Sequence, residues 1–389
     1  MVNEVKRVAI ITNVIANYRE DFYRRILADQ SMAITVFCQD AITGMNLKTV
    51  HEKFAKNVKL IKSIGLAKEK IAWQFLPFLD LYKNHDILFF YGNPRVLSNV
   101  IYSVLFKMLG KKVIIWGQAH TAGANPIMEK IRLAWWRFFD YLFLYTDNEI
   151  EYLQNKGFKA QKMLGMNNGL NQDEIDHAKA QWPAERLAEW KKQQGIEKNT
   201  LLLSCARLEP KNQFELMIPA LAKLCETNPK ILWCVIGQGQ QEAALRNAVN
   251  QAGLDDHVLW LGAIYDENEL APWFISSTLL IHPGAIGLSL LHAFGYALPV
   301  ITHNDMANQM PEMAAFEDDI NGVLFVNKDA SSLFQTIHQQ LSDEYKRQQL
   351  SQAAYQTAKK RFNTTIMAHR FLDMAMLTDA NSAYPNQGA

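Results

Sequence analysis

Short apolar runs alternate with longer segments of helical hydrophobic spacing along most of the chain. In the first part, the apolar runs lie in RVAIITNV, AITVFCQ, DILFFYG, KKVIIWG and YLFLYTD. Helical spacing follows the first run from about Asp21 and the third run near Leu97 to Leu109. Apolar runs joined by helices are typical of parallel strands with crossover connections. The pattern therefore predicts a doubly wound α/β domain.

The same alternation begins again near residue 200 and continues through TLLLSCARL, ILWCVIGQG, HVLWLGAI, TLLIHPG and LPVITHN. A polar, turn-forming stretch at Asn167 to Asn171 separates the two series. We therefore predict two doubly wound, Rossmann-like α/β domains, residues 1–171 and 172–360. Residues 361–389 are expected to form a helix that packs back on the first domain, followed by a frayed end.

The composition fits a two-domain enzyme. A chain of 389 residues with 49% hydrophobic residues can bury a large core. Lys and Arg number 40 against 39 Asp and Glu, a balance that argues against a nucleic-acid partner. No apolar run approaches the roughly 18 residues of a membrane span, and the N-terminus lacks the apolar core of a secretory signal. The four cysteines form no C-x-x-C pair, so we expect reduced thiols in a cytoplasmic protein.

Ligands of open α/β sheets bind beyond the carboxyl ends of the strands, so the loops after the apolar runs are the places to search. In SCARLEPKNQ, Arg207 and Lys211 follow such a run and lie four residues apart. A planar guanidinium and a compact ammonium group together suit a diphosphate. A solvated pair of cations beside Glu209 is the alternative interpretation.

In IHPGAIGLSLLHAF, Gly284 and Gly287 stand between an apolar run and a helix. Glycines allow close approach of the backbone, and the unpaired amides of a helix start attract phosphate. A strand-to-helix turn with packing glycines is the alternative. Gly237 and Gly239 resemble the opening of a dinucleotide fingerprint, but the third glycine is missing. We therefore place Gly237 at the edge of the site.

Two histidines stand at positions where a site residue is expected. His120 follows a strand of the first domain, and His292 falls on the second turn of the helix after Gly287. No histidine pair has the spacing of a metal site on one helix, and the paired aspartates at 255–256 and 318–319 are in turn contexts. We expect no bound metal and no cofactor.

The segment IMEKIRLAWWRFFDYLFLY interleaves basic and aromatic residues. Residues 130–139, with Trp135, Trp136 and Arg137, are compatible with a patch that contacts a membrane surface. A helix packed on its own sheet is the favoured interpretation, because aromatic residues mostly serve cores.

Taken in order, these motifs resemble family 4 of the glycosyltransferases, in which two Rossmann-like domains (the GT-B architecture) enclose a nucleotide sugar. CARLEPKNQ is similar to the family's G-R-L-x-x-x-K-N, VIGQG to its strand and loop, and VLWLGAI to its V-x-F-L-G. DDINGVLF is similar to a turn on the nucleotide side, and NNGLN to the P-N-G-V-D of the domain junction. The similarity covers nearly the whole chain, and the ordered series is more specific than any one motif.

The resemblance implies roles for particular residues. Arg207 and Lys211 match the pair that holds the donor diphosphate, and His120 matches a histidine near the transferred sugar, so these three are the expected catalytic residues. Gly287 and Leu288 match the phosphate-binding helix start. The full set of donor-binding positions expected on these grounds is Arg207, Lys211, Gly237, Ala263, Ile264, Gly284, Ala285, Ile286, Gly287, Leu288 and His292.

The chain departs from the family at two hallmark positions. The family's E-G-F-G-L-x-x-L-E-A carries two glutamates, and here their places hold Gly284 and His292. The first glutamate normally contacts the donor sugar and the second the ribose, so both contacts are expected to differ. His292 can still share one hydrogen bond with a ribose hydroxyl.

The first domain also departs from its relatives. The turn after its first strand is TNVIANYREDF, where many relatives have a glycine-rich turn. We expect Asn17 and Arg19, together with Arg95, to bind an anionic or polyhydroxyl acceptor. Tyr18 is either a lid over the site or a packing residue.

The resemblance implies a metal-independent glycosyltransferase that moves a hexose-type sugar from a UDP- or GDP-sugar to a hydroxyl of a glycan or lipid-linked glycan. Retention of configuration, a role in surface polysaccharide synthesis and action at the inner face of the cytoplasmic membrane are implied in the same way. Two alternatives stay open, a nucleotide-sugar 2-epimerase and a catalytically weakened binding subunit. A nicotinamide oxidoreductase is disfavoured, because no complete G-x-G-x-x-G appears.

Overall fold

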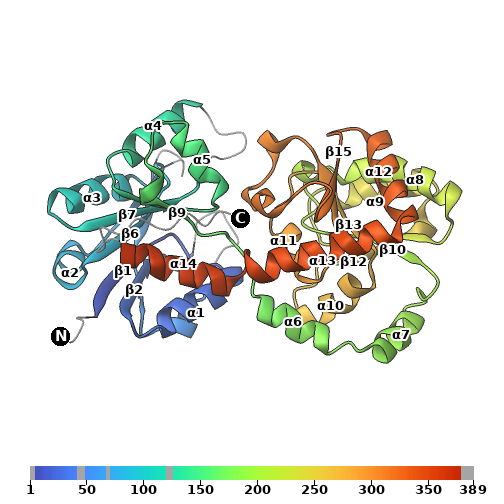
Figure 1. Cartoon of the computed structure of the whole chain (residues 1–389), viewed down its shortest axis with the longest axis horizontal. Coiled ribbons are helices and arrows are strands. Elements are labelled where there is room, and N and C mark those ends of the chain that lie inside the picture. Colours follow the sequence, from blue (N-terminus) through green and yellow to red (C-terminus); the bar gives the residue numbers. More distant parts are fainter. Residues whose placement is uncertain (1–4, 42–48, 67–70, 120–125, 378–389) are drawn as a thin grey trace. The chain divides into compact units, whose positions relative to one another are not determined.

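The computed structural model of the chain describes residues 5–41, 49–66, 71–119 and 126–377 (Figure 1). By its internal contacts the chain divides into two compact units. The first unit contains residues 1–168 and 364–389, and the second contains residues 169–363. The chain therefore passes between the units twice. Each passage lies three residues from a boundary expected from the sequence, 171/172 or 360/361.

The first unit is built on a parallel sheet with the strand order β3-β2-β1-β6-β7-β8-β9. Its strands are β1 (Lys6–Ile11), β2 (Met32–Cys38), β3 (Val58–Leu60), β6 (Ile87–Tyr91), β7 (Lys112–Gly117), β8 (Tyr141–Leu144) and β9 (Met163–Gly165). The apolar runs in the sequence correspond to β1, β2, β6, β7 and β8. The edge strands β3 and β9 have three residues each, too few to show a hydrophobic period.

Helices cover both faces of this sheet (Figure 1). One face carries α1 (Glu20–Ala28) and α14 (Thr364–Leu377), and the other carries α2 (Phe78–Asn84), α3 (Leu97–Met108), α4 (Pro126–Trp136) and α5 (Asn148–Gln154). The ring of Phe371 on α14 contacts the rings of Phe22, Phe89 and Phe143. Because these rings are buried, α14 is part of the core of the first unit although it follows the second unit in sequence.

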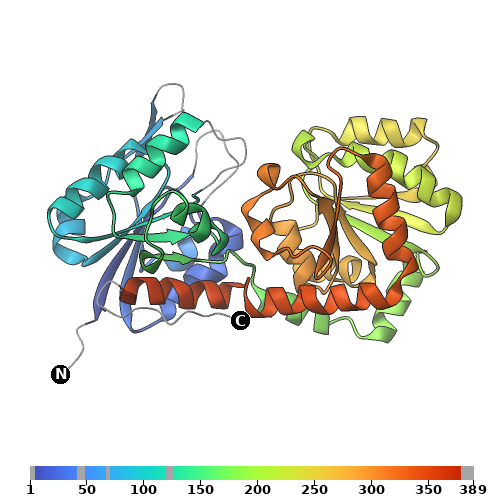
Figure 2. The same cartoon turned by 45° about the horizontal axis from the view of Figure 1, so that its top comes forward.

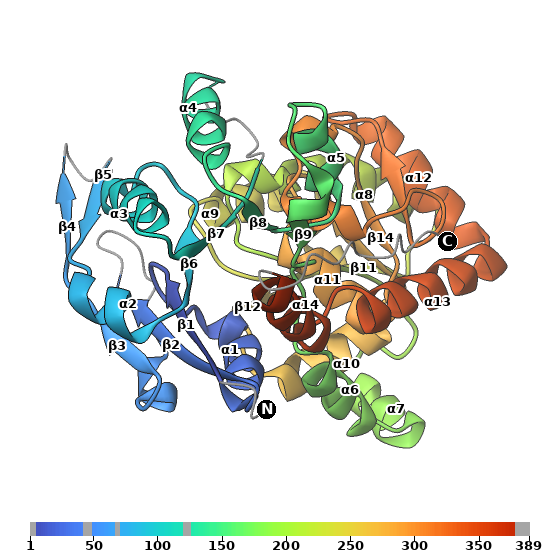
Figure 3. The ribbon, with the colours of Figure 1, turned by 60° about the vertical axis from the view of Figure 1, so that its left-hand side comes forward.

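A short antiparallel hairpin of β4 (Ser63–Leu66) and β5 (Ile71–Gln74) lies beside α3 (Figure 3). The sequence pattern did not predict this hairpin. Its second strand is tied to α3 by the amide of Gln74, which donates to the hydroxyl of Ser98 over 2.9 Å.

The second unit is built on a parallel sheet with the order β12-β11-β10-β13-β14-β15. Its strands are β10 (Thr200–Cys205), β11 (Ile231–Ile236), β12 (Val258–Gly262), β13 (Leu279–His282), β14 (Val300–His303) and β15 (Gly322–Phe325). Five of them are the apolar runs of the second series, and β15 lies in the DDINGVLF motif. Both units are doubly wound, as the sequence predicts. In each, the strand order reverses beside the first strand, so the loops after β1 and β6, and those after β10 and β13, start at a topological switch point.

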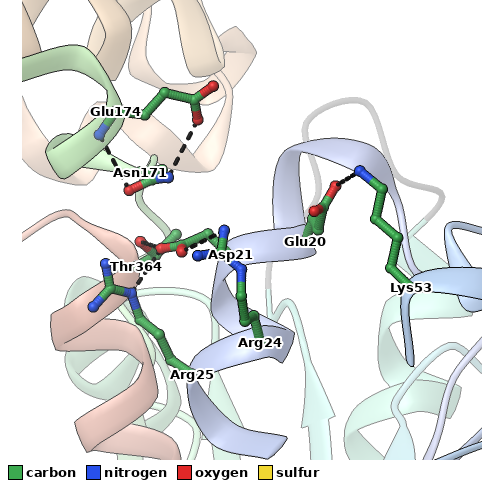
Figure 4. A network of polar contacts seen from close by, with 8 residues as sticks. All are labelled: Glu20, Asp21, Arg24, Arg25, Lys53, Asn171, Glu174 and Thr364. Atoms are coloured by element: carbon green, nitrogen blue, oxygen red, sulfur yellow. Dashed lines mark hydrogen bonds and ion pairs between the residues drawn. The ribbon is translucent and has the colours of Figure 1, made fainter. Parts of the chain in front are cut away.

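Helices also cover both faces of the second sheet (Figure 2). One face carries α6 (Gln172–Ala180), α10 (Glu267–Ser276), α11 (Leu288–Gly295) and α13 (Glu344–Lys360), and the other α8 (Met217–Thr227), α9 (Glu242–Gln251) and α12 (Ala330–Ser342). The exposed helix α7 (Ala184–Gln193) is held by Trp190, whose ring lies 4.8 Å from that of Trp273 on α10. At the start of α6, Asn171 accepts from the amide of Glu174 and donates to its carboxylate, which caps the helix (Figure 4).

The structure bears on several further expectations. All four cysteines are free thiols. Among the described residues, no helix combines the length and apolar character needed to cross a bilayer. In the same part of the chain, no group of three or more His, Cys, Asp or Glu side chains is arranged to hold a metal ion.

Candidate functional site

In the second unit, the loop after β10 is joined to the loop after β13 by backbone contacts. The amide of Ala285 donates to the carbonyl of Lys211 over 3.1 Å. A Cβ atom on Gly284 would lie only 2.1 Å from that same carbonyl oxygen. The close approach that the sequence predicts for Gly284 is therefore an approach to the Lys211 backbone of the protein itself. No side chain, glutamate included, fits at Gly284 unless the β10 loop moves.

The β10 loop presents two cations to solvent. The Arg207 side chain is 76% exposed, and its Nη1 lies 3.8 Å from Glu209 Oε1. Such a long, exposed ion pair is weak and readily exchanged for a ligand. Lys211 is also exposed and has no ion pair among the residues that the structure describes. The side chain of Asn212 donates to the carbonyl of Arg207 over 2.6 Å and closes the loop between the two cations.

Buried polar groups hold the β13 loop, which contains Ala285 and Ile286, from beneath. The amide of Ile286 donates to Gln309 Oε1 over 2.9 Å, and Gln309 Nε2 donates to Thr302 Oγ1 and to the carbonyl of His303. His282 Nδ1 lies 3.3 Å from the carbonyl of Gly284. The pKa of His282 is lowered to about 4, mainly by burial, with smaller contributions in the same direction from His303 and Lys211. A neutral His282 therefore supports the loop.

Helix α11 begins at Leu288. Its N-cap residue is Gly287, which has no side chain to form a capping hydrogen bond. A Cβ atom on Gly287 would lie 3.8 Å from Glu312 Oε2 and 3.8 Å from Met310. This is ordinary contact distance, so Gly287 tolerates a small side chain. Glu312 is buried and brings a carboxylate beside the helix start, which no sequence motif indicated. In the sequence, Glu312 is marked only by the proline before it and a strand upstream. Its neighbour Gly287 lies 25 residues earlier in the chain, so no local pattern could reveal the contact.

His292 lies in a partly buried cluster that no sequence motif indicated. Its Nε2 is 2.8 Å from Glu267 Oε1, which also accepts from the hydroxyl of Tyr296 over 2.5 Å. The Phe274 ring packs on His292 with a centroid distance of 4.5 Å. Burial alone would raise the pKa of Glu267, but the hydrogen bonds from His292 and Tyr296 lower it overall. A charged carboxylate therefore reaches the second hallmark position from helix α10.

The loops after β11 and β12 pack against the β10 loop. Gly237 has φ of +142°, and its amide donates to the carbonyl of Gly262 over 2.7 Å. A Cβ on Gly237 would lie 1.9 Å from the carbonyl of Ala206, so this glycine allows a backbone contact directly before Arg207. Ala263 and Ile264 follow β12 and are half-buried. The structure thus places the expected donor-binding positions of the second unit in the loops after β10 to β13 and on helix α11.

In the first unit, a cavity of about 160 Å³ lies at the carboxyl ends of β1, β6, β7 and β8. Its aromatic lining consists of Tyr18, Tyr23, Tyr91, Trp116 and Tyr145. Thr12, Asn13 and Arg19 supply its other polar groups. We call this cavity the tyrosine pocket. None of the described residues that line it is acidic.

Arg19 is 8% exposed and lines the tyrosine pocket. Its Nη2 donates to Asn168 Oδ1 over 3.3 Å, and its guanidinium lies over the rings of Tyr145 and Trp116 at 5.1 and 5.6 Å. Burial alone would lower the pKa of Arg19, but the electrostatic influence of the surrounding tyrosines raises it overall. The side chain is therefore a buried permanent cation.

The other residues expected to bind the acceptor lie elsewhere. Asn17 and Arg95 are exposed and do not line the tyrosine pocket, although their loops follow β1 and β6. Tyr18 is half-exposed at its rim. His120 lies outside the described residues.

The basic and aromatic segment 130–139 proves to be a packed helix end. Trp135 and Trp136 are buried, and Trp136 Nε1 donates to the carbonyl of Gly92 over 3.2 Å. The packing interpretation is confirmed, and the two tryptophans are excluded as membrane contacts.

Comparison with known proteins shows which protein family the second unit resembles. Residues 188–357 match the model of the family described as glycosyl transferases group 1. The matched range lies in the second unit, which therefore resembles a group 1 glycosyltransferase domain. An exopolysaccharide phosphotransferase of Streptomyces coelicolor is 30% identical over 142 residues, which is 36% of this chain. The match covers only 14% of that protein's length.

Solved structures match the fold of nearly the whole chain. The Anabaena protein HepE, in complex with UDP, matches with a TM-score of 0.72 at 14% identity, over 96% of this chain and all of the other. A glycosyltransferase from Rickettsia africae matches with a TM-score of 0.72 at 15% identity, over 97% and 99%. A putative UDP-N-acetylglucosamine 2-epimerase from Listeria monocytogenes matches with 0.63 at 13% identity, over 98% and 99%. The GT-B fold predicted from the sequence is confirmed.

The match to the family model lies entirely within the second unit. Arg207, Lys211, Gly284 and His292 all lie within the matched residues. The first unit lies outside the matched range, so the tyrosine pocket has to be interpreted from its own geometry.

Proposed function

We propose that the protein transfers a hexose-type sugar from a nucleoside-diphosphate sugar, UDP- or GDP-linked, to a hydroxyl of a glycan or lipid-linked glycan acceptor. The observation that carries this proposal is the backbone join between Lys211 and Ala285. It fixes the loop that bears Arg207 and Lys211 against the loop that leads into α11. Two exposed cations and a helix start on one rigid assembly suit a diphosphate.

The proposed chemistry depends on stabilising the leaving group. When the bond between sugar and diphosphate breaks, negative charge grows on the diphosphate oxygens. Arg207 and Lys211 are charged before the reaction, and the closed loop holds their backbone in place, which reduces the reorganisation needed as this charge develops. In our proposal these groups act without a metal ion, and the departing phosphate accepts the proton of the acceptor hydroxyl, which gives retention.

His292 is proposed to position the nucleotide ribose. Its Nε2 is engaged by Glu267, so Nδ1 is the ring atom left for a ligand. The carboxylate and the Phe274 ring fix the orientation of the imidazole. Glu267 is thus a positioning residue in the cluster that occupies the place of the family's second glutamate.

We further propose that the enzyme works in surface polysaccharide synthesis at the inner face of the cytoplasmic membrane. The exopolysaccharide relative supports the first part. Exposed apolar residues on α3 support the location at the membrane. Ile101 is 52% and Met108 74% exposed, and Leu97 and Leu105 lie on the same side of the helix. We call these four residues the α3 stripe. A monomer seldom leaves such a stripe in water without a partner surface.

A donor panel tests the proposed reaction. The full-length protein is incubated with UDP- and GDP-sugars, and free nucleotide, free sugar and sugar epimers are measured. Release of nucleotide with transfer or hydrolysis of the sugar is the expected result. Formation of an epimer without release of nucleotide would establish the 2-epimerase instead, a fold relative of this chain. No turnover of any donor that binds would leave only a binding subunit.

A further inference from the structure

The tyrosine pocket holds a buried cation without a carboxylate partner. Arg19 is more than nine-tenths buried, and no described carboxylate forms an ion pair with it. Its hydrogen-bond partners are neutral: the oxygen of Asn168 at 3.3 Å, the sulfur of Met166 at 3.9 Å and the Tyr18 hydroxyl. Buried charges in proteins are normally paired, because removing a charge from water is costly. An anionic ligand would supply the missing counter-charge.

The acidic residues nearest to Arg19 in sequence are engaged elsewhere (Figure 4). Glu20 pairs with Lys53 over 2.7 Å. Asp21 pairs with Arg24 and Arg25 and accepts from the hydroxyl of Thr364. Both carboxylates of helix α1 therefore have other partners. Neither pairs with Arg19, which lines the tyrosine pocket.

The remaining donors of Arg19 suit an oxyanion. A guanidinium has five N–H donors in a planar fork, so the contacts with Asn168, Met166 and Tyr18 leave donors for a ligand. This fork matches the paired oxygens of a carboxylate or a phosphate. Because no acidic side chain is among the described residues that line the tyrosine pocket, none of these residues repels an anion.

The size and lining of the pocket indicate what carries the oxyanion. A volume of about 160 Å³ is below the usual ligand-pocket range of about 300–1,000 Å³, so one sugar-sized group fits and a longer glycan does not. Tyrosine and tryptophan rings offer apolar faces for the C–H face of a pyranose, and the phenol groups hydrogen-bond to its hydroxyls.

We propose that the tyrosine pocket binds an acidic sugar unit of the acceptor, with Arg19 paired to its carboxylate or phosphate group. This proposal rests on the transferase function proposed above and names the class of its acceptor. The enzyme then selects acidic glycan acceptors over neutral ones, because a neutral sugar leaves the buried guanidinium without a counter-charge.

The test compares three matched probes by calorimetry on the full-length protein: methyl glucuronoside, glucose 6-phosphate and the neutral methyl glucoside. We expect one or both charged probes to bind at least about tenfold more tightly than the neutral one. Binding of the glucuronoside alone assigns a carboxylate, and binding of the phosphate ester alone assigns a phosphate. Equal affinity for the neutral and charged probes would overturn the proposal, and this comparison needs no variant.

Variants assign the effect to Arg19. Arg19→Gln should lose the preference for charged probes, and Arg19→Lys should keep part of it, because the charge stays while the fork is lost. Arg24→Gln, on the exposed side of α1, is the matched control and should behave as wild type. A charge preference that survives in folded Arg19→Gln would contradict the assignment.

UDP and GDP are titrated into the same samples, which separates the two proposals. If nucleotide binds but the charged and neutral probes bind equally, the proposal of an acidic acceptor is refuted and the proposed transferase function still stands. If the charged probes bind more tightly but neither nucleotide binds, the proposed transferase function is refuted and the site for an acidic sugar still stands.

Discussion

At the scale of single residues, Gly284 stands where the sequence comparison above expects a glutamate. A Cβ at this position meets the carbonyl of Lys211 at 2.1 Å, so the glycine is required by the join between the two loops. We predict that Gly284→Glu, which restores the family residue, lowers both the thermal stability and the affinity for nucleotide. Gly287→Ala is the control, since its Cβ would have 3.8 Å of room. Higher turnover of Gly284→Glu with an unchanged melting temperature would refute this view of the position.

Glu267 is a residue that sequence reasoning did not find, because its partner His292 lies on a different helix. The pKa of Glu267 is lowered in the folded protein, below its ordinary value near 4.5. The carboxylate therefore stabilises the fold at pH values above that range, and the contribution is lost as the pH falls through the folded pKa.

We predict that Glu267→Gln loses about 1–3 kcal/mol of unfolding free energy at pH 7, and that the gap to wild type narrows under acid. Melting temperatures measured from pH 7 down to pH 3 check this, with exposed Glu269→Gln on the same helix as control. A gap that stays constant over that range would show that the charge of Glu267 is not what stabilises the cluster.

At the scale of elements, the strands that position the candidate site were predictable, and most of its supporting contacts were not. The apolar runs of β10 and β13 fixed where Arg207 and Gly284 lie, because ligand loops follow strands. Gln309 and Glu312 follow β14, and their contacts depend on its pairing with β13, which local patterns do not encode. The edge strands β3, β9 and β15 are three or four residues long and gave no clear period.

Helix α3 gives a prediction at this scale. Its buried face was visible in the sequence spacing, but the α3 stripe became apparent only from exposure in the fold. We predict that wild type sediments with anionic vesicles and that the double variant Ile101→Ser, Met108→Ser does so markedly less. Trp136, which a composition argument would choose, is buried and cannot serve as the contact. Equal sedimentation of both proteins would remove the membrane role of the α3 stripe.

At the scale of the whole molecule, the C-terminal helix α14 belongs to the first unit, whereas the donor site proposed here lies in the second. Phe371 is fully buried among Phe22, Phe89 and Phe143. We predict that Phe371→Ala costs the first unit about 3–5 kcal/mol but leaves nucleotide binding by the second unit unchanged. Calorimetric unfolding with and without nucleotide measures both quantities. Loss of nucleotide binding in the folded variant would show that the donor site depends on the first unit.

The central claim is that Arg207 and Lys211 stabilise the leaving diphosphate. The most direct measurement is the turnover of the donor sugar by Arg207→Ala and Lys211→Ala, beside Arg246→Ala, an exposed arginine of the same unit that pairs with Glu242. Our account predicts losses of ~10² to 10³ in the first two variants, with the fold intact, and normal turnover in the third. Unchanged turnover in Arg207→Ala or Lys211→Ala would contradict it.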